Sequence, residues 1–243
     1  MMSVLLSIEN AFASLIHVFT KYSGMFGEAM LMTLLLSVGT VMCSIILGSL
    51  VAFMKISRRK IPRALATAYV AFIRGTPLLV QIYIVFYGLP MLGIHLPSVS
   101  FMGASLDRFL SGLLALVINS TAYVCEIVRG GIQSIDEGQM EAARSIGFNK
   151  RQSMLYIVMP QAFKNILPAI GNEVVAIIKE SSQVSVIGLA ELMYTTNTIR
   201  AISFRSFEPL IIVSVLYFIL TAAISFIVKK VEARLAVSNR SKD

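Results

Sequence analysis

The sequence is poor in charged residues, contains no tryptophan, and has only two histidines and two cysteines. Charged residues make up 14% of its 243 residues and hydrophobic residues 56%, whereas about a quarter of an average soluble domain is charged. This composition excludes an ordinary soluble domain and indicates an integral membrane protein. His17 and His95 fall outside the hydrophobic segments, and Cys43 and Cys125 lack metal-ligand spacing. We therefore expect neither a metal site nor a disulfide framework.

The sequence also lacks the motifs of catalytic and nucleotide-binding proteins. No glycine is followed by lysine, which excludes a phosphate-binding P-loop, and there is no Gly-x-Ser-x-Gly motif. We therefore expect this chain to have no enzyme activity by itself and to bind no cofactor. If nucleotide energy drives the protein, ATP and Mg²⁺ must bind to another polypeptide.

An excess of basic residues is present instead, and it is concentrated at the ends of hydrophobic segments. The formal charge is +8, and most of the basic residues lie in the segments 55–63, 144–164 and 229–242. Without interleaved aromatic residues, this pattern argues against nucleic acid as a partner. Short basic loops stay in the cytoplasm, so we predict an external amino terminus and a cytoplasmic carboxyl terminus.

The hydrophobic segments predict an all-α, polytopic membrane fold. A spanning helix needs about 20 apolar residues, and five segments reach that length, at 28–54, 63–92, 109–134, 165–190 and 207–229. They form a single predicted transmembrane domain, residues 28–235, followed by a cytoplasmic tail, residues 236–243. Residues 91–107 and 191–206 are expected to be outer loops.

The amino-terminal residues do not read as a cleaved signal peptide. The first 23 residues lack a basic leading region and a small-residue cleavage site. We expect residues 1–27 to form an amphipathic lead-in that lies on the membrane.

The longest polar interruption between the hydrophobic segments is residues 137–160, which we call the elbow. Met140, Ala143 and Ile146 are spaced three residues apart, which places them on one face of a helix. Gly147 occupies the position of a glycine that ends a helix. The first half of the elbow is therefore predicted to be a short amphipathic helix that stops at Gly147.

The second half of the elbow predicts another short helix, with Asn149 as its N-cap. It is expected to end at Pro160, because proline cannot donate a backbone hydrogen bond. Its pattern predicts exposed side chains at Lys150 and Arg151 and buried ones at Met154, Leu155 and Val158. The alternative interpretation is an ordinary amphipathic connector on the lipid surface.

The second hydrophobic segment contains Arg74-Gly75-Thr76-Pro77 near its middle, where proline should break the helix. Thr76 can then cap an outward-running half-helix, whose positive dipole end would point to the middle of the membrane. Discontinuous helices hold anionic substrate groups there in secondary transporters. A simple proline kink is the alternative. Gln81 adds a polar group one turn further along.

The third and fourth segments also carry polar side chains. Asn119, Tyr123 and Glu126 share a helical face, which should line the interior of a bundle or a watery path. Glu126 and Arg129 are favoured as a structural ion pair over contact with a ligand. In the fourth segment, substrate contact and structural pairing remain equally open. The candidate substrate-binding residues are Thr76, Gln81, Asn119, Tyr123, Glu173 and Glu180.

The elbow has a spacing that resembles a known family. Glu141-Ala142-Ala143 is followed by Gly147, by Ile157 and by Met159-Pro160. This pattern resembles the EAA loop of permease subunits in binding-protein-dependent ATP-binding-cassette importers, with Met159 where leucine is usual. The segments that narrow the resemblance to the polar amino-acid uptake branch are FIRGTPLLVQIYIVFYGLP, NSTAYVCEIVRGGIQSIDEGQMEAA and IGNEVVAIIKESSQVSVIGLAEL. The resemblance covers residues 28–235 and leaves out the first 23.

The resemblance implies a type I importer fold in a bacterial inner membrane. Two permease subunits would enclose the path, as a homodimer or, less favoured, a heterodimer, and two cytoplasmic ATPase subunits would drive them. A binding protein or domain outside the cytoplasm would deliver an amino acid. The elbow would be the coupling helix, docked on the ATPase. The residues that match the family's motif there are Glu141, Ala142, Ala143, Gly147, Ile157 and Pro160.

Two readings compete with an importer subunit. An ion-coupled secondary amino-acid transporter would also use intramembrane charges and a broken helix, but it has no use for a docking elbow with this spacing. A membrane scaffold that only binds partners would leave the break at Thr76 and the acidic residues of the fourth segment without purpose.

Overall fold

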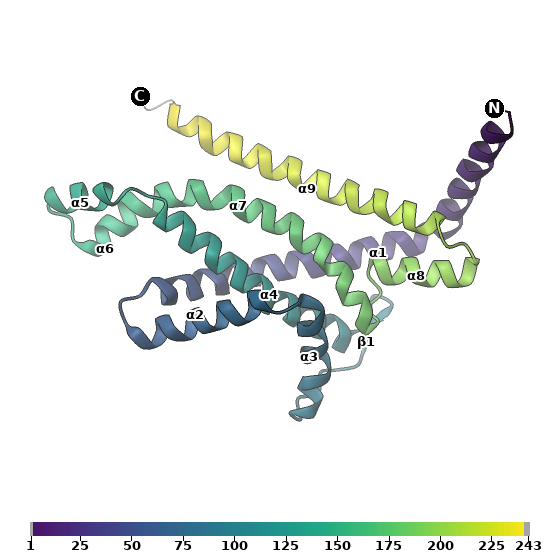
Figure 1. The fold of residues 1–243 in the computed structure, drawn as a ribbon, viewed down its shortest axis with the longest axis horizontal. Helices are drawn as coiled ribbons and strands as arrows, with labels where there is room; N and C mark the ends of the chain where they lie inside the picture. Colours follow the sequence, from purple (N-terminus) through teal and green to yellow (C-terminus); the bar gives the residue numbers. More distant parts are fainter. Residues whose placement is uncertain (1, 241–243) are drawn as a thin grey trace. The chain divides into compact units, whose positions relative to one another are not determined.

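The structure is a computed structural model that describes residues 2–240, with the side chains of residues 9–10 and 12–233. It is almost entirely α-helical (Figure 1), as the composition predicts. The helices are α1 (Met2–Ile56), α2 (Lys60–Gly75), α3 (Leu78–Met91), α4 (Leu106–Gln133), α5 (Glu137–Ser145), α6 (Lys150–Ser153), α7 (Met159–Glu180), α8 (Leu192–Ser203) and α9 (Glu208–Arg240). A π-helical turn (Met154–Val158) precedes α7 and a 3₁₀ helix (Ser181–Ile187) follows it.

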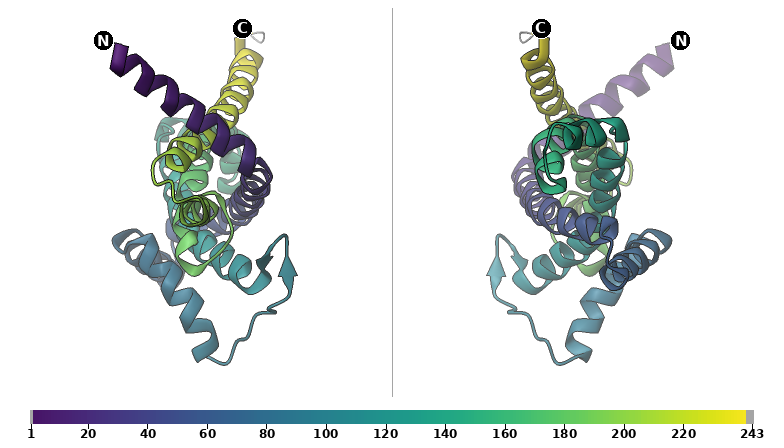
Figure 2. Two further views of the ribbon diagram at one scale, coloured as in Figure 1. Left: turned by 90° about the vertical axis from the view of Figure 1, so that its right-hand side faces the viewer. Right: turned by 90° about the vertical axis from the view of Figure 1, so that its left-hand side faces the viewer.

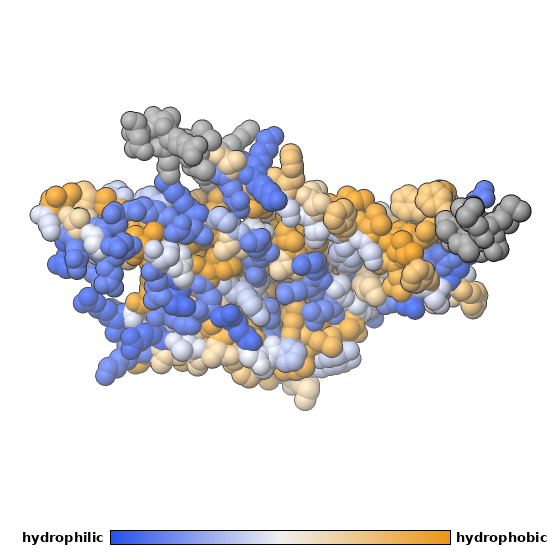
Figure 3. Space-filling view, turned by 45° about the horizontal axis from the view of Figure 1, so that its top comes forward, coloured by the Kyte–Doolittle hydropathy of each residue, from blue (hydrophilic) through white to orange (hydrophobic). Residues whose placement is uncertain are grey.

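The long apolar helices account for most of the predicted membrane spans. In the described part of the chain, three helices are long and apolar enough to cross a membrane, over Phe12–Ile56, Leu106–Gln133 and Glu208–Ala233. The broken pair α2 and α3 makes up to four. Figure 3 shows hydrophobic side chains over much of the visible surface, as expected for helices that face lipid. The fourth predicted span, residues 165–190, covers most of α7 and the 3₁₀ helix after it, so a count of five remains a prediction.

The predicted boundaries at the two ends of the chain fall inside helices. α1 continues across residues 27 and 28, and the only non-helical backbone angles within it are at Tyr22 (φ −113°, ψ 16°). α9 extends to Arg240, so it enters the predicted tail at residues 236–243. Residues 241–243 of that tail lie outside the described residues.

The predicted break in the second segment is present. α2 ends at Gly75, Thr76 adopts an extended backbone (φ −120°, ψ 146°), and α3 begins at Leu78. Proline explains the break, because it disfavours helical angles at the residue before it.

The chain folds into two compact units. The first unit combines the residues up to Gly39 with Leu78–Ala115 and Ile178–Ala222. It contains α3, α8 and a hairpin of two short antiparallel strands, β1 (Ser100–Phe101) and β2 (Ala104–Ser105) (Figure 2). The α8 helix differs from the predicted outer loop at 191–206. Its polar residues Thr195 and Thr196 are buried, so tertiary packing rather than hydrophobic periodicity holds it.

The second unit combines Thr40–Pro77, Leu116–Ile177 and the residues from Ala223 onward. Its core is a cluster of small and β-branched side chains from α1, α2, α4 and α7. Glycines allow these helices to pack closely. A methyl group added at Gly48 would lie 2.6 Å from Val124 of α4, and one at Gly131 would lie 2.3 Å from Ile166 of α7. Both helix pairs therefore depend on the absence of a side chain.

Candidate functional site

The first helix of the elbow, α5, begins with a side-chain cap. The Asp136 carboxylate accepts a hydrogen bond from the Gly138 amide at 2.7 Å. An acidic N-cap satisfies an amide that has no partner within the helix and lies at the positive end of the helix dipole. The start of α5 is therefore fixed by its own sequence.

The chain reverses at Gly147, as the sequence predicts. Gly147 has a φ of +97°, a conformation that is strained for residues with a side chain. The Phe148 amide donates to the Ala143 carbonyl and the Gly147 amide to the Arg144 carbonyl, both at 3.1 Å. These are the two hydrogen bonds of a Schellman motif, so the end of α5 is closed by backbone groups alone.

The second helix of the elbow starts with a capping box. The Asn149 side chain accepts a hydrogen bond from the Gln152 amide, and the Gln152 side chain accepts one from the Asn149 amide, both at 2.9 Å. This reciprocal arrangement satisfies two amides. It confirms the prediction of an N-cap at Asn149.

The expectation that this helix ends at Pro160 is wrong. α6 passes through the π-helical turn at Met154–Val158 directly into α7, which contains Pro160. The Met159 amide donates to the Met154 carbonyl, five residues back. Since proline has no N–H and its ring crowds the carbonyl four residues before it, a wider turn lets the helix continue. The elbow is thus joined to α7 without a loop.

The elbow exposes several large apolar side chains. Ile146 is 76% exposed, Leu155 56% and Tyr156 63%. Val158 is buried, as predicted, and Ala143 is buried as well, but the expectation of a buried Leu155 is wrong. The extra residue in the π turn changes which side chains face inward, and the sequence pattern assumed a regular helix. Among the residues that match the family's motif, Glu141, Ala142, Gly147 and Pro160 are exposed, Ile157 is half-buried and Ala143 is buried.

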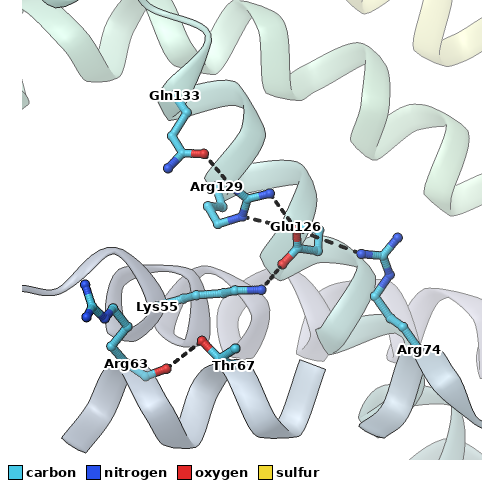
Figure 4. A network of polar contacts seen from close by, with 7 residues as sticks. All are labelled: Lys55, Arg63, Thr67, Arg74, Glu126, Arg129 and Gln133. Carbon is cyan, nitrogen blue, oxygen red and sulfur yellow. Dashed lines mark hydrogen bonds and ion pairs between the residues drawn. The ribbon is translucent and has the colours of Figure 1, made fainter. Parts of the chain in front are cut away.

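A cluster of charges surrounds Glu126 in the second unit (Figure 4). Its carboxylate accepts hydrogen bonds from the Lys55 ammonium and from the Arg129 guanidinium, the latter at 2.8 Å. Arg74 approaches the same carboxylate at 3.9 Å. The predicted ion pair between Glu126 and Arg129 is therefore present, within a group of three cations from α1, α2 and α4 that share one acid. We call these four residues the Glu126 cluster.

Arg74 links this cluster to a candidate substrate residue. Its guanidinium lies 5.2 Å from the centre of the Tyr123 ring, within the range of a cation–π interaction. Thr76, two residues further along, donates a hydrogen bond back to the Phe72 carbonyl at 3.0 Å. Lys55 and Arg74 were missed as partners from the sequence, although a basic residue inside a span is itself a signal that an acid lies nearby.

The other candidate substrate residues divide between the two units. In the second unit Asn119 is buried, and Ser120 beside it donates a hydrogen bond at 2.8 Å to Glu173, which joins α4 to α7. Gln81 and Glu180 belong to the first unit, where Gln81 is buried and Glu180 half-buried. Within the second unit, Asn119 and Tyr123 lie on α4, Thr76 directly follows α2, and Glu173 lies on α7.

The first unit holds a buried acid that the sequence did not single out. Glu191 is fully buried, caps α8 by accepting a hydrogen bond from the Tyr194 amide at 2.7 Å, and accepts another from the Tyr217 hydroxyl at 2.8 Å. Burial raises the pKa of its carboxyl to about 7, because no cation is among these partners to favour the charged form.

Comparisons with known proteins agree with this architecture. A model of binding-protein-dependent transport system inner membrane components matches residues 44–237. An arginine transport system permease protein of Bacillus subtilis is 40% identical over 86% of this chain and 91% of its own length. A glutamine transport system permease protein of Escherichia coli is 33% identical over 86% of this chain and 92% of its own.

Solved structures lead to the same family. The crystal structure of an amino acid ABC transporter with histidines has 42% identity, a TM-score of 0.81, and coverage of 89% of this chain and 96% of that one. The inward-facing MetNI methionine ABC transporter shares the fold, with a TM-score of 0.64 at 16% identity. The chain therefore belongs to the family of inner membrane components of binding-protein-dependent transport systems.

Proposed function

We propose that this chain is the transmembrane subunit of an ATP-driven importer. It forms the path for an amino acid delivered by an extracytoplasmic binding protein and couples to a cytoplasmic ATPase through the elbow. The observation that carries the proposal is the exposure of Ile146, Leu155 and Tyr156 on a segment whose helix ends are closed by its own caps. Such a segment suits a groove on a partner protein, because its apolar side chains supply contact area and its basic rim sets orientation.

The elbow is suited to transmit force. Its first helix is closed at both ends by hydrogen bonds, and its second helix runs without a loop into α7. α7 carries Glu173, which holds α4 through Ser120. When the ATPases close on ATP and move the elbow, we infer that α7 moves with it and changes the packing against α4 in the second unit.

The amino acid is proposed to bind in the second unit, along the faces that carry Thr76, Asn119, Tyr123 and Glu173. Its carboxylate would lie near the break at Thr76. Arg74 supports that assignment, because its guanidinium places a positive charge next to the break and lies over Tyr123. Glu173 would accept the amino group.

The partners follow from the family. We propose two permease copies, identical by preference, two ATPase subunits that bind ATP and Mg²⁺, and a binding protein. In the inner membrane the elbow and the carboxyl terminus would face the cytoplasm, where the basic segments also lie by the positive-inside rule, and the amino terminus would lie outside.

The test is amino-acid uptake by vesicles that contain the permease with its ATPase and binding protein. Uptake should require ATP and persist when ion gradients are collapsed. Gly147→Asp should insert and fold but hydrolyse ATP without uptake, because an aspartate at a φ of +97° distorts the reversal. Ser145→Asp adds the same charge two residues earlier and should transport normally.

Other outcomes would reject the proposal. Uptake that follows an ion gradient in the absence of the ATPase would indicate a secondary transporter. Normal uptake by Gly147→Asp would remove the elbow from the coupling pathway.

A further inference from the structure

The second unit contains a basic pocket that the proposed transport path does not use. It has a volume of about 880 Å³ and lies between the end of α1, the face of α2 and the end of α4. Four of its lining residues are basic, namely Lys55, Lys60, Arg63 and Arg129, and none of the described lining residues is acidic. Its volume falls in the range of small-molecule sites. The pocket is therefore large enough for more than a single inorganic ion.

The positive charge of the pocket comes from two sources. Lys55 and Arg129 are held in place by Glu126, as Figure 4 shows. Lys60 and Arg63 are exposed in the first turn of α2, and the N-cap residue of α2, Arg59, makes no side-chain cap. The positive end of the α2 dipole therefore adds to the cations. Glu126 supplies one negative charge beside the four basic residues of the pocket, so the pocket keeps an excess of positive charge.

The floor of the pocket is formed by small side chains and runs along α2. It consists of Ala64, Thr67, Ala68 and Ala71, which follow one helical face by spacings of three and four. The Thr67 hydroxyl is directed back to the Arg63 carbonyl at 2.7 Å (Figure 4). Beside this face Ile61, Leu65 and Phe72 are 76%, 61% and 62% exposed. The basic residues at the opening of the pocket are thus followed by a face of small side chains that has an apolar border on one side.

We propose that this pocket binds the phosphate headgroup of an anionic membrane lipid, such as phosphatidylglycerol, with an acyl chain along this face of α2. Basic residues at the end of transmembrane helices attract anionic headgroups. Neither a free phosphate nor an acidic protein segment needs the apolar border that follows the charges. The lipid would fasten the α1–α2 connection to the bilayer, and this role is independent of the proposed transport function.

The test is lipid retention by the permease purified with its ATPase and measured by native mass spectrometry. The complex should retain phosphatidylglycerol in preference to phosphatidylcholine. Lys60→Gln combined with Arg63→Gln should weaken that retention about tenfold, since each basic residue near a membrane surface contributes to binding of an anionic lipid. The double variant Lys229→Gln and Lys230→Gln is the matched control, because it removes the same charge from exposed positions of α9 that do not line the pocket.

Each remaining outcome overturns the proposal. Equal retention of the two lipids, or equal loss in the control variant, would mean unspecific attraction. Displacement of the lipid by excess inorganic phosphate would assign the pocket to a free anion. Loss of the ATPase subunit from the Lys60→Gln and Arg63→Gln complex would assign it to an acidic protein surface.

Discussion

The second unit has two connections between long helices that differ in construction. The α1–α2 connection is residues 57–59, and the elbow is residues 137–160; both carry basic residues. The α1–α2 connection has no side-chain cap at Arg59, and Lys55, just before it, is held by Glu126 in another helix. The elbow is held by Asp136, directly before it, and by Gly147 and Asn149 within it.

The two connections are held in place in different ways. The α1–α2 connection depends on one carboxylate that three cations share, so its position relies on tertiary contacts. The elbow depends on several local hydrogen bonds, each of modest strength, so its shape should survive the loss of any one. A surface that must dock on a partner benefits from local rigidity, whereas a surface that contacts lipid needs only charge and an apolar border.

The largest effect is expected from Glu126→Gln. This change leaves Lys55, Arg74 and Arg129 close together without an anion. Breaking a fully buried ion pair costs about 3 kcal/mol or more, and since the Glu126 side chain is 17% exposed, we expect a loss of about 2.5 kcal/mol. The melting temperature of the purified protein in detergent should fall markedly. Glu137→Gln in the exposed first turn of α5 is the control and should change stability by less than about 0.5 kcal/mol. Equal shifts in the two variants would show that the cluster does not hold the α1–α2 connection.

A smaller effect is expected from Ile146→Asp, and it concerns binding rather than folding. Ile146 is 76% exposed, so stability should not change, but affinity for the ATPase should fall by about 2 kcal/mol if it is a central contact. Ile61→Asp in the first turn of α2 is matched, because Ile61 is also 76% exposed. The affinity of both variants for the ATPase is measured by titration. An equal loss of affinity in the two variants would contradict a specific role of the elbow in docking.

Removal of the Asn149 cap should cost about 1 kcal/mol. Asn149→Ala should speed amide hydrogen exchange at Gln152 and its neighbours in residues 150–153, because the Gln152 amide loses its side-chain partner. Asn149→Asp keeps an acceptor and should restore the slow exchange. If exchange in this segment stays slow in the alanine variant, the capping box does not hold the helix.

The smallest effect is expected from giving the α1–α2 connection the cap that it lacks. Arg59→Asn should slow amide exchange in the first turn of α2 and stabilise it by about 0.5 kcal/mol. Arg58→Asn removes the same charge one position earlier and should give no such protection. If amide exchange slowed in both variants, the cause would be reduced repulsion among the basic side chains and not a new cap.

The features that the sequence predicted correctly depend on neighbouring residues. The reversal at Gly147 and the cap at Asn149 involve groups only a few positions apart, and the break after Thr76 follows from Pro77 itself. The pairing of Lys55 with Glu126 joins residues in different helices, so no local pattern indicates it. α8 was expected to be a loop because its residues are polar. Its threonines are nevertheless buried by packing against other segments, which the polarity of the sequence does not indicate.

Pro160 shows a different limit. The rule that proline ends a helix assumes a regular turn before it, and the chain avoids the clash by widening that turn at Met154–Val158. The roles of Thr76, Gln81, Asn119, Tyr123, Glu173 and Glu180 in binding a substrate stay predictions, since they concern a ligand and not the fold.

The π turn also determines how α5 and α6 are rotated around the axis of α7. In an α-helix each residue advances the chain by about 100°, so one residue inserted or removed between Met154 and Val158 would rotate α5 and α6 around the axis of α7 by about that angle. Ile146 would then face a different direction while every cap stayed intact. The length of this turn therefore determines the direction in which the elbow presents Ile146 to a partner. The contacts that keep the elbow folded do not determine that direction.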